Sequence, residues 1–341
     1  MDDGHSTDGR PSRREFLTRA GRVAGGLAVI GIAGLKPRLG AAAIQRAFTG
    51  ASYLLELDGQ IVATPRFSEG GFPKADVIQE PTAPLVKKHI GPPRFEDIVI
   101  ECDPAMPKPL LDWVNSALAM TPLRKNGAVV TADFNRKEQS RLQFTNAVIT
   151  EVGFPAFDGN SKEPGALTVK FAPEFTTPLA GKGTDVSATL AQKTGGKLWM
   201  PGNFRLTIPG LDCTKVSKID AFTIKQKVPD ALGQTRDFNK EPGKLEFPNL
   251  CLYVAEASAG TFYAWFQDMV LKGNSGEQNE RIGTLELMDP GMKGVLLTVT
   301  FHHLGIFSFK PESAESNRDT IKRVKVEMYC EQITLAPGKA V

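Results

Sequence analysis

Histidine is the first side chain to consider for chemistry, because it is the commonest general base and a frequent metal ligand. Beyond residue 43 the chain has three histidines: His89, His302 and His303. The last two lie in the alternating run LTVTFHHL at 297–304, where neighbouring side chains of a strand point to opposite faces. We therefore do not expect the two imidazoles to bind one ion together, and a histidine pair at the sheet surface is favoured over a metal site.

His89 lies in the basic segment 87–93, KKHIGPP, which is typical of a turn. Such a turn can bind an anion or a partner, although a solvated turn is the commoner role. The chain has no CxxC pair and too few cysteines for a disulfide scaffold, so buried strand positions are expected. Outside the cytoplasm, the pair to check for a disulfide is Cys251 and Cys330. The four cysteines are Cys102, Cys213, Cys251 and Cys330.

No nucleophile elbow, phosphate-binding loop or dinucleotide fingerprint occurs in the sequence. Carboxylate pairs such as Glu96 with Asp97 and Glu277 with Glu280 lie beside predicted strand or loop boundaries, where charged residues are routine. A glycosidase dyad stays open, because its partners can be distant in sequence, but nothing selects two residues. The sequence therefore predicts no catalytic residues, no cofactor and no metal, and indicates that the protein is not an enzyme.

The elements that would position any site are mostly β-strands. Short runs with period-two alternation, such as 53–57, 167–171 and 324–328, are bounded by Gly, Pro, Asn and Asp. Only two segments have a convincing helical pattern, at 109–120 and 260–271. Their aromatic residues are expected to pack on a sheet rather than to stack on a ligand. These aromatic residues are Trp113, Phe262, Tyr263, Trp265 and Phe266.

The N-terminus carries the pattern of a twin-arginine export signal in SRREFLT at 12–18. The apolar run at 23–35 is too short to cross a bilayer, and small residues follow it for cleavage. We therefore expect a signal peptide over 1–43, with a periplasmic or extracellular mature protein. A chance pair of arginines in a cytoplasmic protein and an uncleaved tether are the alternatives. The residues that carry the signal are Arg13, Arg14, Phe16 and Leu17, with Ala41 and Ala43 at the cleavage site.

The basic charge of the chain belongs to this segment. Residues 1–43 hold seven of the 41 Lys and Arg and four of the 38 Asp and Glu, which leaves 34 of each in the remainder. A neutral mature body has no general attraction for nucleic acid or anionic lipid. We expect no nucleic-acid partner and no stable membrane span after cleavage.

An internal repeat divides the mature chain. A shift of the sequence by 152 superposes Phe95 on Phe247 and Trp113 on Trp265 without a gap, and these four residues are the expected core of the repeat. The strands before and after the helices recur in the same order. This predicts domains at 47–178 and 198–336, joined by an exposed Gly-rich linker at 179–197.

The repeat unit resembles the phage tail tube protein family, including the tube fold of contractile injection systems. The resemblance lies in RFEDIVI at 94–100, in LLDWVN at 110–115 and in LQFTNAVI at 142–149. In the second half Trp265 is kept, but the run from His302 to Leu304 replaces the Asn-Ala element.

The resemblance implies a mainly β fold: two tandem β-sandwich or barrel domains, each with one packed α-helix. It also implies self-association into stacked six-fold rings, together with partners from a tail or injection apparatus. Two domains per chain would complete a pseudo-six-fold ring as a trimer, and closed symmetry satisfies every sheet edge. An export signal argues against a role in a virus. The alternative is a monomeric exported binding protein that uses the loops at 87–93 and 226–244.

Overall fold

The computed structural model describes residues 52–338, except 83–84, 188–197, 233–237 and 313–321. The predicted export signal, from Arg13 to Ala43, lies outside the described residues. Within the described part of the chain, no helix is both long and apolar enough to cross a membrane. Strands dominate what is described, with barrel-like sheets and few helices, so the prediction of a mainly β fold is confirmed.

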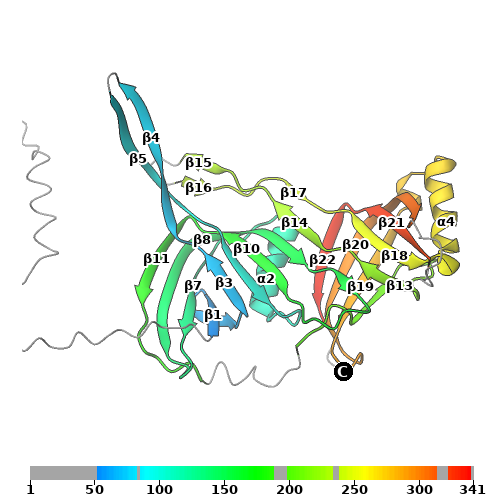
Figure 1. The fold of residues 1–341 in the computed structure, drawn as a ribbon, viewed down its shortest axis with the longest axis horizontal. Helices are drawn as coiled ribbons and strands as arrows, with labels where there is room; N and C mark the ends of the chain where they lie inside the picture. Colours follow the sequence, from blue (N-terminus) through cyan, green and yellow to red (C-terminus); the bar gives the residue numbers. More distant parts are fainter. Residues whose placement is uncertain (1–51, 83–84, 188–197, 233–237, 313–321, 339–341) are drawn as a thin grey trace, which may run out of the picture. The chain divides into compact units, whose positions relative to one another are not determined.

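The larger sheet has ten strands and is built mainly from the first half of the chain (Figure 1). Its order is β2-β1-β7-β8-β10-β6-β3, with β11 and β14 paired to β8, and β17 paired to β14. The strands are β1 (Ser52–Leu57), β2 (Gln60–Ala63), β3 (Phe67–Gly70), β6 (Ile98–Cys102), β7 (Lys125–Ala132), β8 (Glu138–Phe154), β10 (Leu167–Ala172), β11 (Phe175–Ala180), β14 (Phe222–Gln226) and β17 (Leu245–Glu246).

The second sheet has eight strands and is built mainly from the second half. Its order is β12-β19-β20-β21-β18-β13-β9, and β22 pairs with β20. The strands are β9 (Phe157–Asp158), β12 (Phe204–Thr207), β13 (Val216–Ile219), β18 (Leu250–Ala255), β19 (Arg281–Met288), β20 (Val295–Pro311), β21 (Arg323–Tyr329) and β22 (Gln332–Pro337).

Each sheet is organised around one strand of 17 residues, β8 or β20. Both strands contain a left-handed residue: Asn146 has φ of 50° and His303 has φ of 56°. Up to the residue that follows it, the strand pairs with β7 and β11, or with β19 and β22; beyond that point, the strand pairs with β10 or β21. A local irregularity of this kind bends a strand, so one strand serves two parts of a curved sheet.

Two helices lie where the sequence predicts them. α2 spans Lys108–Leu118 and begins after Pro107, and α4 spans Gly260–Phe266 and continues as a π-helical turn, Gln267–Leu271. Short 3₁₀ turns occur at Glu256–Ser258 and Glu277–Asn279. Each helix buries a tryptophan whose indole N–H donates to a carbonyl further along the chain: Trp113 to Leu123 at 2.9 Å and Trp265 to Asn279 at 3.0 Å. The indole therefore fixes both the helix and the segment that leaves it.

The segment 87–93 is not the turn that the sequence suggested. It lies in β5 (Leu85–Phe95), which pairs with β4 (Pro73–Thr82) in a separate two-stranded sheet, the β4–β5 hairpin (Figure 1). The prolines are tolerated because this ribbon has free edges and a register shift near them, between Ala75 and Val77. The predicted loop 226–244 likewise contains a second small hairpin of β15 (Asp230–Leu232) and β16 (Phe238–Lys240), called here the β15–β16 arm.

The first part of the predicted linker, 179–187, is mostly exposed, but it is attached to the first half at two places. β11 continues to Ala180, and Val186 is 6% exposed in a small cluster with Leu54. The amide of Val186 also donates to the carbonyl of Arg136. The remainder of the segment, 188–197, lies outside the described residues.

Candidate functional site

The two halves of the chain share strands. β14 belongs to the second half by sequence, yet it pairs with the end of β8 in the first, with Phe222 opposite Phe154 and Ile224 opposite Val152. The rings of Phe222 and Phe154 stack with centroids 4.7 Å apart, and both side chains are buried. The halves therefore meet through backbone pairing and a buried aromatic contact, and not only through a linker.

A second strand crosses in the opposite direction. β9, from the first half, pairs with β13 of the second sheet, placing Phe157 opposite Ile219. The ring of Phe157 is fully buried and packs edge-on against Trp199 and Phe204. Because each half contributes a strand to the other's sheet, separating the halves would expose several aromatic side chains.

Helix α2 provides a third contact between the halves. The side-chain amide of Asn115 donates to the carbonyl of Leu335 in β22 at 2.9 Å, and the amide of Leu335 donates to Asn115 Oδ1 at 3.3 Å. β22 pairs on its other side with β20. One amide side chain thus satisfies both backbone groups of a residue on the outer edge of β22.

A polar triad in the first half holds the β15–β16 arm. The triad is Arg124, Asn146 and Glu174, in which Arg124 forms an ion pair with Glu174 and Asn146 donates to Glu174 at 2.8 Å. Arg124 also donates to the carbonyl of Lys240, whose amide donates to Glu174 at 3.2 Å. The triad therefore contacts the backbone of Lys240 in the arm, and Lys240 is 9% exposed.

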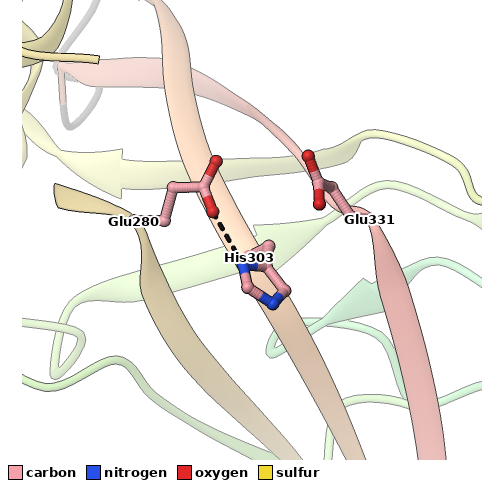
Figure 2. Close-up of side chains that lie close together, drawn as sticks. All are labelled: Glu280, His303 and Glu331. Atoms are coloured by element: carbon pink, nitrogen blue, oxygen red, sulfur yellow. Dashed lines mark hydrogen bonds and ion pairs between the residues drawn. The ribbon is translucent and has the colours of Figure 1, made fainter. Parts of the chain in front are cut away.

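The second half carries another cluster of titratable side chains, Glu280, His303 and Glu331 (Figure 2). Their ligand atoms lie within 4.8 Å of one another. His303 Nδ1 is 2.8 Å from Glu280 Oε2, and the hydroxyl of Tyr329 donates to Glu280 Oε1 at 2.7 Å. Glu280 is largely covered, with 7% of its side chain exposed, whereas His303 and Glu331 face solvent.

The cluster is negatively charged when its imidazole is neutral. The hydrogen bond that His303 donates to Glu280 raises the pKa of His303, and the charges of Glu280, Glu331 and Glu277 raise it further, against partial desolvation. Burial raises the pKa of Tyr329 to about 12, and the hydrogen bond to Glu280 adds to that effect. One imidazole nitrogen and two carboxylates are ligands that divalent cations accept. They equally form a site for an ammonium or guanidinium group.

The thiol beside this cluster is a poor nucleophile. Burial raises the pKa of Cys330 to about 11, so its reactive thiolate is scarce at neutral pH. All four cysteines are free, and the thiols of Cys251 and Cys330 contact separate partners, Glu327 and His302.

The adjacent His302 and His303 contact different partners, as expected from the alternation of side chains along a strand. His302 lies 3.0 Å from the hydroxyl of Thr334, on β22, whereas His303 faces Glu280. Sequence reasoning missed the cluster because its members come from three separate segments: the end of a 3₁₀ turn, the middle of β20 and the β21–β22 turn. The only available signal was that His303 occupies the place of the Asn-Ala element in the first half.

The predicted repeat-core residues fall into two groups. Trp113 and Trp265 are buried, at 1% and 4% exposure. Phe247 is partly buried against the core, and Phe95 packs edge-on against the half-exposed Phe175 at 4.9 Å.

Comparison with known proteins gives distant structural likenesses. No protein-family model and no curated protein matches the chain. A sheath/tube terminator of an extracellular contractile injection system is similar over 40% of this chain and 100% of its own, with 15% identity and a TM-score of 0.35.

Two further structures are similar to this chain. An anti-feeding prophage baseplate protein matches 39% of this chain and 91% of its own, at 12% identity and TM-score 0.33. Hcp1 from Flavobacterium johnsoniae matches 40% of this chain and 98% of its own, at 9% identity and TM-score 0.25. Likenesses this distant carry no conclusion about assembly, partners or activity.

Proposed function

We propose that the chain is a non-enzymatic assembly protein, exported by its twin-arginine signal, whose two tail-tube-like halves associate with those of other chains into rings or tubes. The observation that carries the proposal is the joint between the halves, where β14 pairs with β8. That joint uses one face of the first half and a different face of the second. Such an interface is heterologous, so it leaves one unused face of each kind on every chain.

The proposal treats the halves as two copies of one unit, and the strand registers support this. In the first half Val169 of β10 lies between Val152 and Ile100. In the second half Val326 of β21 lies between Phe309 and Leu252. The residue numbers of β20 and β21 exceed those of β8 and β10 by 157, and the left-handed residues Asn146 and His303 have the same offset. The residue numbers of β18 exceed those of β6 by 152, which is also the offset between the two tryptophans.

Repeating the joint between chains generates the assembly. The second half of one chain would receive the first half of the next, in the relation that the first half has to the second within a chain. Three chains would close a pseudo-six-fold ring, and stacked rings would form a tube. Closure would pair the strand edges that a single chain leaves open, which otherwise invite uncontrolled association.

Size and imaging of the purified protein test this proposal. Light scattering over a concentration series should give a mass near three chains or a higher multiple, and electron microscopy should show rings. A strict monomer at high concentration, with no rings, would overturn the proposal and favour the monomeric binding protein instead.

Export is tested separately. Changing Arg13→Lys together with Arg14→Lys should retain the protein in the cytoplasm, because the signal depends on the arginine pair. Fractionation with the unchanged chain as control checks this. Export of the doubly changed chain at the normal level would contradict the assignment of the signal.

A further inference from the structure

We infer that the β4–β5 hairpin of one chain lies across the second half of a neighbouring copy, with its Lys87–Lys88 edge against the Glu280–His303–Glu331 cluster. The inference rests on the proposed self-association and names its contact surface. It accounts for two features that the fold of a single chain leaves unexplained: an exposed hairpin and an exposed negatively charged cluster.

The hairpin carries apolar side chains that nothing covers in the described chain. Val77 and Ile78 on β4 are 59% and 50% exposed, and Leu85, Val86 and Ile90 on β5 are 75%, 54% and 75% exposed. An isolated two-stranded ribbon is marginally stable in water. Several exposed apolar side chains on such a ribbon are typical of an interaction site.

The β15–β16 arm shows where the β4–β5 hairpin belongs, because the two hairpins correspond. In the second half Lys225 pairs with Glu246, and Asp230 pairs with Lys240. Subtracting an offset of 151 on the first strand and of 152 on the second gives Lys74 with Arg94, and Gln79 with Lys88. Both are register pairs of β4 and β5. Lys88 is therefore the counterpart of Lys240.

The residues that hold Lys240 have counterparts in the cluster. Lys125 pairs with Ala147 in the first half, and Arg281 pairs with Leu304 in the second, so β7 and β19 are offset by 156 and β8 and β20 by 157. Arg124 thus corresponds to Glu280.

The other two members follow from the offset of 157 that β8 and β10 share with β20 and β21. Asn146 corresponds to His303, and Glu174 corresponds to Glu331. The Glu280–His303–Glu331 cluster is the triad of the second half, placed to receive the hairpin position that Lys88 occupies.

The triad and the cluster differ in charge, and the two hairpins that they would contact differ in the complementary sense. In the first half the triad contains a cation, Arg124, beside Glu174. In the second half a carboxylate, Glu280, replaces that cation. In the arm Lys240 is paired with Asp230, whereas in the hairpin Lys88 is paired with the neutral Gln79. The more negative surface would thus meet the hairpin whose lysine has no carboxylate opposite it, which gives attraction and selects the partner.

A second part of the same surface is open beside the cluster. Residues 308–311 of β20 pair with β21 on one side, and no described strand pairs with their other side. Their counterparts in β8, residues 151–154, are occupied there by β14. Phe307 is accordingly 42% exposed, whereas its counterpart Thr150 is 6% exposed.

The donor for this edge is the beginning of β4. The offset of 151 that relates β4 to the second half places β14 on the segment 71–75. Phe72 in that segment is 57% exposed, whereas its counterpart at this offset, Thr223 of β14, is partly buried. The start of β4 would extend the end of β20 in the neighbouring chain as β14 extends β8 within one chain.

Charge exchange between Lys88 and Glu331 tests the contact. In the purified full chain, Lys87→Glu with Lys88→Glu should shift the mass from oligomer to monomer and raise the dissociation constant of assembly by at least tenfold. Lys88→Glu alone should weaken assembly, and adding Glu331→Lys to it should restore most of the loss. The matched control Lys162→Glu, at an exposed lysine of the β9–β10 loop, should leave the mass unchanged.

Cysteine cross-linking locates the same contact directly. Lys88→Cys mixed with Glu331→Cys should give a disulfide-linked pair of chains on mild oxidation, whereas either variant alone should give much less. A chain that never oligomerises would overturn the proposed function itself. An oligomer that is indifferent to the charge reversals and forms no cross-link would leave the proposed function standing and overturn this inference.

Discussion

Two sets of three side chains occupy corresponding positions in the two halves and differ in what they contact. Arg124, Asn146 and Glu174 form a closed network around the backbone of Lys240. Glu280, His303 and Glu331 surround no backbone of the described chain, and two of the three face solvent. The same arrangement of strands thus carries a satisfied polar contact in one half and an open cluster in the other, and the two sets differ in charge because Glu280 stands where the first half has Arg124.

The largest effects should come from the two tryptophans on which both frameworks depend. Trp113→Ala and Trp265→Ala each remove a buried indole, so each should lower the free energy of unfolding by about 3–5 kcal/mol. Trp→Phe at either site keeps most of the packing and loses a hydrogen bond, with an expected cost of about 1–3 kcal/mol. Denaturant unfolding followed by circular dichroism measures both.

These variants test whether the two tryptophans have the same role in the two halves. If the halves correspond, the two Trp→Ala variants should lose similar amounts of stability, and both should exceed their Trp→Phe controls. A near-neutral Trp265→Ala would break the correspondence, because it would mean that α4 does not support its sheet as α2 does.

Substitutions of Ile224 and Phe72 should distinguish a contact that supports folding from a contact that supports assembly. Ile224→Ala removes a side chain that is 1% exposed where β14 pairs with β8, so it should cost about 2–5 kcal/mol of stability. Phe72→Ala, directly before β4, removes a side chain that is 57% exposed and should leave monomer stability within about 0.5 kcal/mol. It should instead weaken assembly, as measured by light scattering.

The side-chain amides of Asn115 and Gln267 should also differ, because the first is expected to support folding and the second assembly. Asn115→Ala leaves both backbone groups of Leu335 without their side-chain partner, which should cost about 1–3 kcal/mol. Its counterpart at an offset of 152 is Gln267, at the end of α4. Gln267→Ala should be nearly neutral for unfolding in dilute protein and should weaken assembly, and thermal unfolding at two concentrations separates the outcomes. If both substitutions destabilised the monomer equally, the proposed difference between a folding role for Asn115 and an assembly role for Gln267 would be wrong.

Much of the fold follows from the sequence because it depends on local periodicity. The alternation at 324–328 predicts β21, and the helical spacing around Trp113 and Trp265 predicts α2 and α4 almost to their ends. The strand exchange was not predictable in this way. Phe222 and Phe157 are apolar strand residues whose local pattern is the same whichever sheet they join, so only long-range packing selects the partner.

The candidate site was less predictable still. The segment around Lys88 has the Gly and Pro content of a turn, and a register shift on an open ribbon is what admits those residues to a strand. Glu280, His303 and Glu331 are far apart in the sequence, and only the tertiary fold brings them together. The available clue lay in the comparison of the halves, where His303 occupies the place of the Asn-Ala element.

The smallest expected effect is on the titration of His303, and it tests whether the open cluster is filled on assembly. Glu280 raises the pKa of His303 above its ordinary value of ~6.5, so protonated His303 stabilises the fold below that pH. The contribution disappears as the pH rises through the raised pKa, and it is small because the imidazole is solvent-exposed. Glu280→Gln should return the pKa towards ~6.5, whereas Glu331→Gln should lower it less, since Glu331 acts only through its charge.

Assembly should lower the same pKa, because a lysine ammonium placed beside Glu280 and Glu331 offsets the negative charge that favours the imidazolium. Nuclear magnetic resonance of the His303 ring compares the assembled chain with the monomer obtained by Lys87→Glu and Lys88→Glu. A lower pKa in the assembly is expected if the hairpin reaches the cluster. An equal pKa in both states would mean that the cluster stays open to solvent after association, and that the correspondence between the two sets of three residues ends at the backbone.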